Sequence, residues 1–303
     1  MAKSSKRAAP PTSCWDDADR HVPCDSFWLT NPLVRRWVNR RVSGDEAVWP
    51  IPWFRDRARD RLPFGRVLSI GCGTGPLERD LVAQEIALHV VGVDPAVGAV
   101  ARARALARQG GMAGRISYVA SSAFDLLRAP GYWDAVFFHG SLHHFENVPG
   151  ILDAVRRSLK PQGLLYLDEY VGRSRADWRL RHLVLPNLAY RLLPRRVRRT
   201  HLVRSPVTDE DPTEQVHSAD ILPAVERFFR VSERRDYGGN LLLLVYPSMR
   251  HPGPGGPSAA AFDRAVGRLL KAEDVLLRVG EGSFHVVLWG EPRPAVGSQV
   301  SRD

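Results

Sequence analysis

Short apolar runs alternate with amphipathic stretches through the middle of the chain. The apolar runs predict strands at 66–70, 89–94, 116–120, 133–140 and 163–170. Between them, apolar residues recur at helical spacing over 76–87, 95–108 and 147–160, which predicts helices. Strands that alternate with helices of this length predict an α/β fold with a parallel, doubly wound sheet.

Local signals mark where several elements begin and end. Pro76 suits the first position of a helix, and Asn147 is a plausible N-cap for the helix that Pro161 follows. The regular alternation stops after residue 170. It resumes with a helix at 218–229 that Ser218 would cap, a strand at 230–238, a long helix at 261–280 and a last strand at 283–290.

These patterns divide the chain into six parts. We expect a disordered basic tail (1–14), an N-terminal helical cover or lid (15–62) and a cofactor-binding α/β core (63–172). An arginine-rich helical insertion (173–217), the rest of the core with a further helical insertion (218–291) and a disordered end (292–303) should follow. The cover is rich in tryptophan and proline, and its helices should end near Gly44. Leucines of the first insertion recur at roughly helical spacing and suggest a lid packed beside an acceptor; they are Leu180, Leu183, Leu185, Leu188, Leu192 and Leu193.

Composition narrows the class of protein. Three cysteines in 303 residues are too few for a disulfide framework, so a reducing, cytoplasmic setting is expected. No apolar run is long enough to span a bilayer, and the basic start lacks the apolar core of a secretory signal. Cys14, His21 and Cys24 lie close together but lack the spacing and the fourth ligand of a zinc site.

The net charge of +10 is concentrated in one place. The segment 171–204 holds ten arginines and a single acid, Asp177, while the rest of the chain is close to neutral. Arginine is well suited to phosphate, so this segment predicts contact with RNA, an anionic lipid surface or a phosphorylated acceptor. The alternative is a solvated helical face without a partner.

A glycine-rich turn between the first strand and the first helix predicts a cofactor site. Gly71, Gly73 and Gly75 let the backbone turn tightly and let a ligand approach a helix N-terminus. Asp94 ends the second strand, where an acid can bind ribose hydroxyls. The turn lacks the last glycine of a dinucleotide fingerprint, which argues against NAD.

Four segments, "VLSIGCGTG", "GVD", "WDAVFFHGSLHHFEN" and "LKPQGLLYLDEY", together resemble the class I S-adenosylmethionine-dependent methyltransferases. The resemblance covers about residues 65–170. It implies a mostly parallel, seven-stranded Rossmann-like sheet whose last two strands form an antiparallel pair, and S-adenosyl-L-methionine as the cofactor. It also implies a set of cofactor-binding residues: Gly71, Gly73, Gly75, Asp94, Ser122, Ala123 and His139.

Two positions depart from the family pattern. Ser122 stands where an acid usually meets the adenine. Ser69 stands where an acid usually helps to orient the amino group of the cofactor. Glu78, or Arg35 or Arg36 of the cover, are candidates to share that second task. These departures leave open a protein that binds the cofactor without catalysis.

The ends of the fourth and fifth strands carry the candidate catalytic residues. Methyl transfer from a sulfonium is an in-line displacement, so the enzyme mainly aligns the acceptor and removes one proton. His143 is our first choice for general base, with His144 as the alternative, and Glu169 and Tyr170 are candidates to orient the acceptor. A divalent metal at this cluster is the less favoured alternative, and no metal site is predicted.

The acceptor is expected to be a small molecule. The sequence "HGSLHH" after the fourth strand lacks the Asn/Asp-Pro-Pro-aromatic motif of base-amine methyltransferases. No cysteine follows strand four or five, which argues against covalent attack on cytosine. We expect a sugar, lipid or natural-product acceptor, with an anionic group such as a phosphate or a linked nucleotide. The alternatives are an RNA-directed methyltransferase or a cofactor-binding module with a basic surface.

Overall fold

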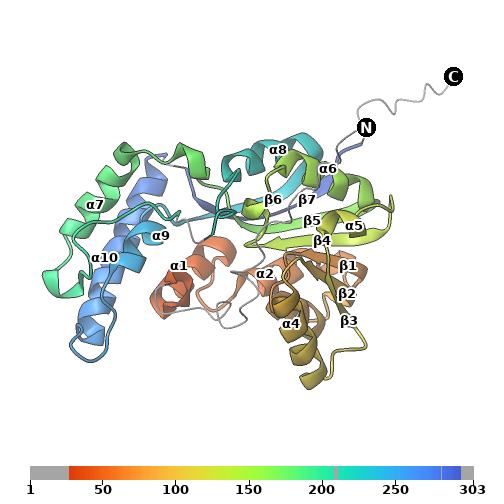
Figure 1. Ribbon diagram of the computed structural model, residues 1–303, viewed down its shortest axis with the longest axis horizontal. Coiled ribbons are helices and arrows are strands. Elements are labelled where there is room, and N and C mark those ends of the chain that lie inside the picture. The colour runs from red at the N-terminus through yellow and green to blue at the C-terminus, as the bar shows by residue number, and fades with distance from the viewer. Residues whose placement is uncertain (1–26, 208–210, 281, 295–303) are drawn as a thin grey trace, which may run out of the picture.

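The computed structural model describes residues 27–207, 211–280 and 282–294, in which one seven-stranded sheet forms the centre (Figure 1). The strand order is β3-β2-β1-β4-β5-β7-β6. The first five strands pair in parallel, and β7 runs antiparallel to both β5 and β6. The strands are β1 (Phe64–Ile70), β2 (Ala87–Asp94), β3 (Ile116–Ala120), β4 (Trp133–His139), β5 (Leu159–Tyr170), β6 (Phe229–Gly238) and β7 (His285–Pro292). The mostly parallel α/β sheet and its closing antiparallel pair are as expected from the sequence.

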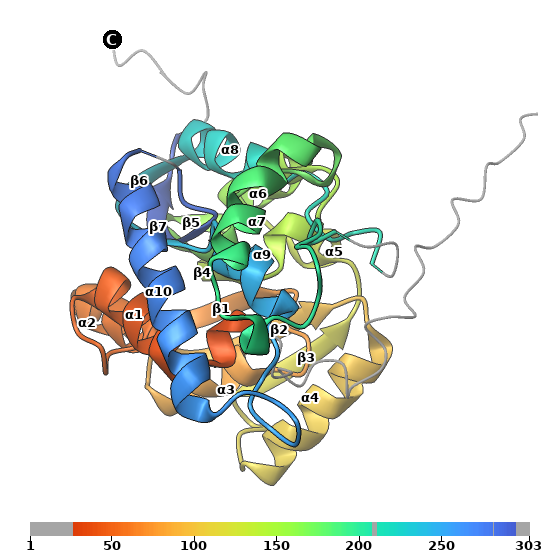
Figure 2. The same ribbon diagram turned by 90° about the vertical axis from the view of Figure 1, so that its left-hand side faces the viewer.

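Helices cover both faces of the sheet (Figures 1 and 2). Successive strand residues alternate between two cores: Val67 and Phe137 face one core, whereas Leu68 and Phe138 face the other. The first core is closed by α1 (Pro32–Ser43), α2 (Pro50–Arg57), α3 (Pro76–Ala83), α4 (Val97–Gln109) and α10 (Ala259–Arg278). The second is closed by α5 (Ala123–Leu126), α6 (Val148–Ser158) and α8 (Ile221–Phe228).

Several boundaries differ from the expectation. The helix α3 ends at Ala83, because Ala87 already belongs to β2, and β5 begins at Leu159 rather than at Gly163. Asn147 caps α6 as predicted, since its side chain accepts a hydrogen bond from the Gly150 amide. The cap predicted for Ser218 is wrong. Ser218 opens a 3₁₀ turn before α8, and its hydroxyl finds no partner among the described residues.

The described part of the N-terminal cover belongs to the hydrophobic core. The helix α1 ends at Gly44, which adopts φ +89°, a conformation that suits glycine. Phe54 of α2 is fully buried and packs its ring against Phe137, Tyr166 and Trp289 of the sheet. Residues 27–62 are therefore part of the folded core, while residues 1–26, with the predicted basic tail, lie outside the described residues.

The arginine-rich insertion differs most from the expectation. It contains the short helix α7 (Val184–Arg191) and 3₁₀ turns at Arg175–Asp177, Leu180–Leu183 and Arg195–Val197. Of the leucines expected to pack as a lid, only Leu193 is fully buried. Leu180, Leu185, Leu188 and Leu192 are exposed. The predicted helix is present as α7, but most of these leucines are exposed to solvent instead of packed as a lid.

Candidate active site

The glycine turn links the end of β1 to the start of α3. Gly71, Gly73 and Gly75 all adopt positive φ, at 72°, 51° and 80°. A Cβ on Gly71 would lie 2.3 Å from Cβ of Ser141, and one on Gly75 would lie 2.2 Å from the hydroxyl of Tyr118. Both backbone conformation and space therefore require glycine at the ends of this turn.

Asp94, at the end of β2, ties the turn in place. Its Oδ2 accepts a hydrogen bond from the Gly73 amide and its Oδ1 accepts one from the Ala96 amide, both at 2.9 Å. Each carboxylate oxygen retains a lone pair for a further donor, such as a ribose hydroxyl. After the end of β3, Ser122 is exposed at the N-cap of α5, and Ala123, the first residue of that helix, is buried.

Glu78 and Arg35 each have buried polar side-chain atoms without a hydrogen-bond partner among the described residues. The carboxylate of Glu78 is fully buried, and neither oxygen has a hydrogen-bond partner among the described residues. Burial raises the pKa of Glu78 to about 7. Nε of Arg35, from α1, is likewise buried without a partner, and burial lowers the pKa of this guanidinium. An orphaned carboxylate and an orphaned guanidinium N–H fit the ammonium and the carboxylate of the cofactor's methionine part.

Asp168 of β5 links side chains of β4 and β6. Its Oδ1 accepts a hydrogen bond of 2.7 Å from the hydroxyl of Tyr237, and its Oδ2 lies 3.5 Å from Nε2 of His139. Burial lowers the pKa of His139, but the Asp168 carboxylate outweighs it and raises the pKa above its ordinary value. His139 ends β4, and 53% of its side chain stays exposed beside Asp168.

Glu169 holds the loop after β4. One oxygen accepts hydrogen bonds from the Ser141 and Leu142 amides, and the other accepts one from the Tyr170 amide at 3.1 Å. The second oxygen also lies 2.8 Å from Nδ1 of His143. Glu169 is 1% exposed. Its geometry makes it a positioning residue that acts through His143, not a direct contact of the acceptor.

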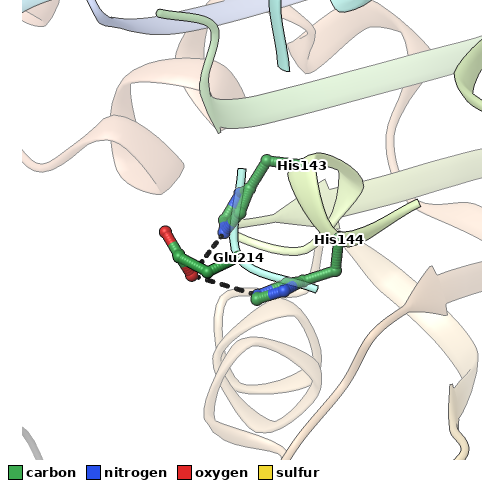
Figure 3. Close-up of side chains that lie close together, drawn as sticks. All are labelled: His143, His144 and Glu214. Carbon is green, nitrogen blue, oxygen red and sulfur yellow. Dashed lines mark ion pairs between the residues drawn. The ribbon is translucent and has the colours of Figure 1, made fainter. Parts of the chain in front are cut away.

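His143, His144 and Glu214 converge at one place, as Figure 3 shows. Nε2 of His143 lies 3.6 Å from Oε2 of Glu214, and Nε2 of His144 lies 3.8 Å from the same oxygen. Burial lowers the pKa of His143, but Glu169 and Glu214 outweigh it and raise the pKa to about 10. With only these neighbours His143 holds a proton at neutral pH, which is the wrong form for a general base.

Tyr170 packs beside this cluster. Its ring meets that of His143 edge-on, with centroids 6.2 Å apart. Its hydroxyl donates to the Arg173 carbonyl at 3.0 Å, and the residue is 4% exposed. Tyr170 therefore supports the ring of His143 and the start of the insertion.

Some residues of the site were not predicted. Glu214 and Thr213 contact His143 and His144 from the far end of the insertion, and the acidic run at 209–214 was the only sequence signal for them.

Val97 and Phe124, 65% and 45% exposed, follow the ends of the paired strands β2 and β3. Their position makes them candidates to flank the adenine.

We expect Asp94→Ala to weaken cofactor binding about tenfold or more. The variant removes both the ribose acceptor and the clamp on the Gly73 amide, and hydrogen bonds to a charged group contribute about 1.5–3 kcal/mol each. Calorimetric titration with S-adenosylhomocysteine measures the change. Asp134→Ala, which removes an acid that contacts Arg66 and Lys160 away from the turn, is the control. Equal affinity of Asp94→Ala and wild type would contradict the assignment.

His285, next to this site, should make the free energy of unfolding depend on pH. It is buried against Trp28 and Tyr237, and this burial lowers its pKa to about 4. The unfolded chain, with an ordinary histidine pKa near 6.5, binds the proton more readily, so stability is lost as the pH falls from about 6.5 toward 4. We expect His285 alone to lower the free energy of unfolding by about 2 kcal/mol between pH 7 and pH 5. Denaturant unfolding of wild type and His285→Gln at both pH values measures it; identical pH dependence in the two proteins would refute it.

Comparison with known proteins agrees with this geometry. A family model described as a methyltransferase domain matches residues 68–167. A ubiquinone biosynthesis O-methyltransferase of Xanthomonas campestris pv. campestris (strain B100) is 32% identical over 168 residues, which are 54% of this chain and 67% of that protein. A protein of the same name from Xylella fastidiosa (strain 9a5c) is 28% identical over 196 residues, covering 64% of this chain and 69% of that protein. An uncharacterized protein of Synechococcus sp. is 32% identical over 114 residues, and the chain spans only 27% of its length.

Solved structures are similar at lower levels of identity. A putative sarcosine dimethylglycine methyltransferase from Galdieria sulphuraria is 12% identical, with a TM-score of 0.48 over 79% of this chain and 83% of that one. A geranyl diphosphate C-methyltransferase from Streptomyces coelicolor A3(2) is 14% identical, with a TM-score of 0.46 over 79% of this chain and 75% of that one. The family model and the Xanthomonas relative carry the assignment, and S-adenosyl-L-methionine is the cofactor. The chain belongs to the class I S-adenosylmethionine-dependent methyltransferases.

Proposed function

We propose that the enzyme methylates a hydroxyl oxygen of a small acceptor that carries a long apolar tail. One observation carries this proposal, an exposed apolar surface on the insertion that we call the α7 stripe: Leu180, Val184, Leu188 and Leu192. Their exposed fractions are 86%, 66%, 55% and 74%. Val184 and Leu188 lie on one side of α7, Leu180 lies in the 3₁₀ turn before it, and Leu192 is its C-cap. A contiguous apolar surface of this kind marks a binding site.

The insertion is fastened to the site at both ends. At its start, the hydroxyl of Tyr170 donates to the Arg173 carbonyl. At its end, the Val216 amide donates to the His143 carbonyl at 3.2 Å. Both ends of the segment that carries α7 therefore lie beside His143 and Tyr170, and we propose that the tail of the acceptor runs from this place toward the α7 stripe.

The arginines of the insertion suit a lipid setting. Among the described residues, no arginine between 179 and 204 forms an ion pair with an acid, and Arg195, Arg196 and Arg199 are exposed. Arginines beside an apolar stripe can contact anionic headgroups while the stripe meets acyl chains. No helix in the described part of the chain has the length and apolar character needed to cross a bilayer. We infer that the acceptor is drawn from a membrane surface.

The reaction is an in-line displacement. A bond forms between the acceptor oxygen and the methyl carbon while the carbon–sulfur bond breaks, and its electron pair stays on the sulfur. The hydroxyl proton passes to His144, because burial lowers the pKa of this imidazole and keeps it neutral, whereas His143 already holds a proton. The Xanthomonas and Xylella relatives are named for O-methylation in ubiquinone biosynthesis, which supports oxygen as the attacked atom.

The test uses hydroxylated aromatic acceptors that differ only in tail length, with S-adenosylmethionine labelled in its methyl group. We expect kcat/KM to rise with tail length. A Leu188→Ser, Leu192→Ser double variant should raise KM for the tailed acceptor at least tenfold, because each buried leucine contributes about 1.5–3 kcal/mol. KM for the tailless acceptor should not change.

Leu88→Ser is the matched control. Leu88 is 46% exposed at the start of β2, outside the insertion, and its variant should behave as wild type. Equal kcat/KM for all tail lengths would contradict the proposal. Transfer to RNA whose rate falls steeply with salt would favour the nucleic-acid alternative.

A further inference from the structure

We propose that His143, His144 and Glu214 form a binding site for a divalent transition-metal ion of the zinc class. One ligand atom from each residue lies within 4.8 Å of the others. The two histidines are adjacent in the 3₁₀ turn Leu142–His144, and Glu214 reaches them from the end of the insertion (Figure 3).

The hydrogen bonds of His144 fix its tautomer. The hydroxyl of Thr213 donates its proton to Oδ1 of Asp211 at 2.6 Å. The same hydroxyl lies 3.0 Å from Nδ1 of His144, so it must accept a hydrogen bond from Nδ1–H. Nε2 of His144 then carries the lone pair, and this is the atom that points toward Glu214.

His143 is held in the same way by a different partner. Its Nδ1 lies 2.8 Å from the buried carboxylate of Glu169, which requires a proton on Nδ1. Nε2 faces Glu214, and a metal ion would displace the proton that this atom carries at neutral pH. Metal-binding histidines typically donate their second N–H to a carboxylate or another oxygen, which orients the ring and increases its basicity. Both histidines of this cluster have that second partner.

The distances and the donors suit zinc-class ions. Metal–ligand bonds of about 2.0–2.1 Å in a tetrahedral site place ligand atoms about 3.3 Å apart. The two separations from Glu214, 3.6 Å and 3.8 Å, exceed this by a few tenths of an ångström. All three ligand atoms lie within 4.8 Å of one another, so side-chain rotations would have to draw them together around an ion. Two imidazoles and one carboxylate favour zinc, iron, cobalt or nickel over magnesium or calcium.

Three protein ligands leave a fourth position open, as in catalytic zinc sites. In a role that rests on the proposed function, the acceptor hydroxyl would occupy that position, and the ion would lower its pKa. The ion would also balance two of the negative charges that Glu169, Asp211 and Glu214 bring to this cluster. The full complement of ligands depends on the insertion, so the site would form only when the insertion is folded against β4.

The test measures metal binding without any acceptor. The chelator-treated full chain is dialysed against Zn²⁺ or Co²⁺, and bound metal is counted per chain. We expect one ion that wild type binds at least 100-fold more tightly than Glu214→Gln or His144→Ala. Glu169→Gln should weaken binding about 10–100-fold through the orientation of His143. Zn²⁺ should raise the Tm of wild type and not that of Glu214→Gln.

His217→Gln is the control, because His217 is a nearby histidine outside the cluster, paired with Asp220. It should bind as wild type does. An ion held by Cys14, His21 and Cys24 would appear equally in all these proteins. Metal binding that is the same in wild type, Glu214→Gln and His144→Ala, with circular dichroism showing both variants folded, overturns the proposal. Since no acceptor is used, that outcome leaves the proposed methyl transfer standing, and failure of the transfer assay leaves the metal site standing.

Discussion

A Gly71→Ala variant is expected to lose at least tenfold in affinity for S-adenosylhomocysteine and about 2–4 kcal/mol in the free energy of unfolding. An alanine at φ +72° costs about 1 kcal/mol in backbone strain. The new Cβ would also lie 2.3 Å from Cβ of Ser141, and overpacking of this kind costs typically about 1–3 kcal/mol. Ser141 cannot move away easily, because Glu169 and the Ile70 carbonyl hold it.

Gly111→Ala separates the two causes. Gly111 also has positive φ, at 69°, but a Cβ there would meet nothing within 4 Å. Its variant should lose only about 1 kcal/mol in the free energy of unfolding and keep full cofactor affinity. Calorimetry and denaturant unfolding of both variants provide the measurement. If the two variants lose the same stability and affinity, the close approach of β1 and the β4 loop does not shape the cofactor site.

A Glu169→Gln variant is expected to lower kcat by about 10²–10³, with a change of less than threefold in cofactor affinity. The amide oxygen can still accept from the Ser141 and Leu142 amides, but the amide nitrogen cannot accept from the Tyr170 amide or from Nδ1–H of His143. His143 would lose the carboxylate that accepts from its Nδ1–H and orients its ring, and the loss of such a partner costs much of catalysis in other enzymes.

The matched variant is Glu146→Gln, which changes an exposed glutamate in the same loop and should leave kcat unaltered. Steady-state kinetics with a tailed phenol, together with calorimetry, separates kcat from cofactor affinity. A loss of cofactor affinity without a loss of kcat would mean that Glu169 serves the cofactor side of the site.

Much of the fold could be predicted because it follows from local patterns. The period-two runs of β1 to β5, the N-cap Asn147 and the glycine turn all depend on neighbouring residues, and the structure has them where the sequence placed them. Ser218 shows the limit of such local signals. A serine before a helical run can cap the helix, but here a 3₁₀ turn intervenes and moves the helix start to Ile221.

The rest depends on contacts between distant segments. Glu214 meets His143 only because the insertion returns to β4, and the charge of Asp168 acts on Arg35 only because α1 packs on the first core. The spacing of the α7 leucines showed a helix face but not its direction, since an outward apolar face has the same period as an inward one. Whether His143 acts as a base also depends on the two carboxylates beside it, one of which is distant in sequence.

Calorimetric titration of the full chain with S-adenosylhomocysteine, and separately with NAD, tests the central claim most directly. The glycine turn, Asp94 and the orphaned Glu78 and Arg35 predict one site per chain with a dissociation constant in roughly the micromolar range. NAD should give no binding heat, because the turn lacks the last glycine of the dinucleotide fingerprint. Tight binding of NAD with no response to S-adenosylhomocysteine would contradict the account.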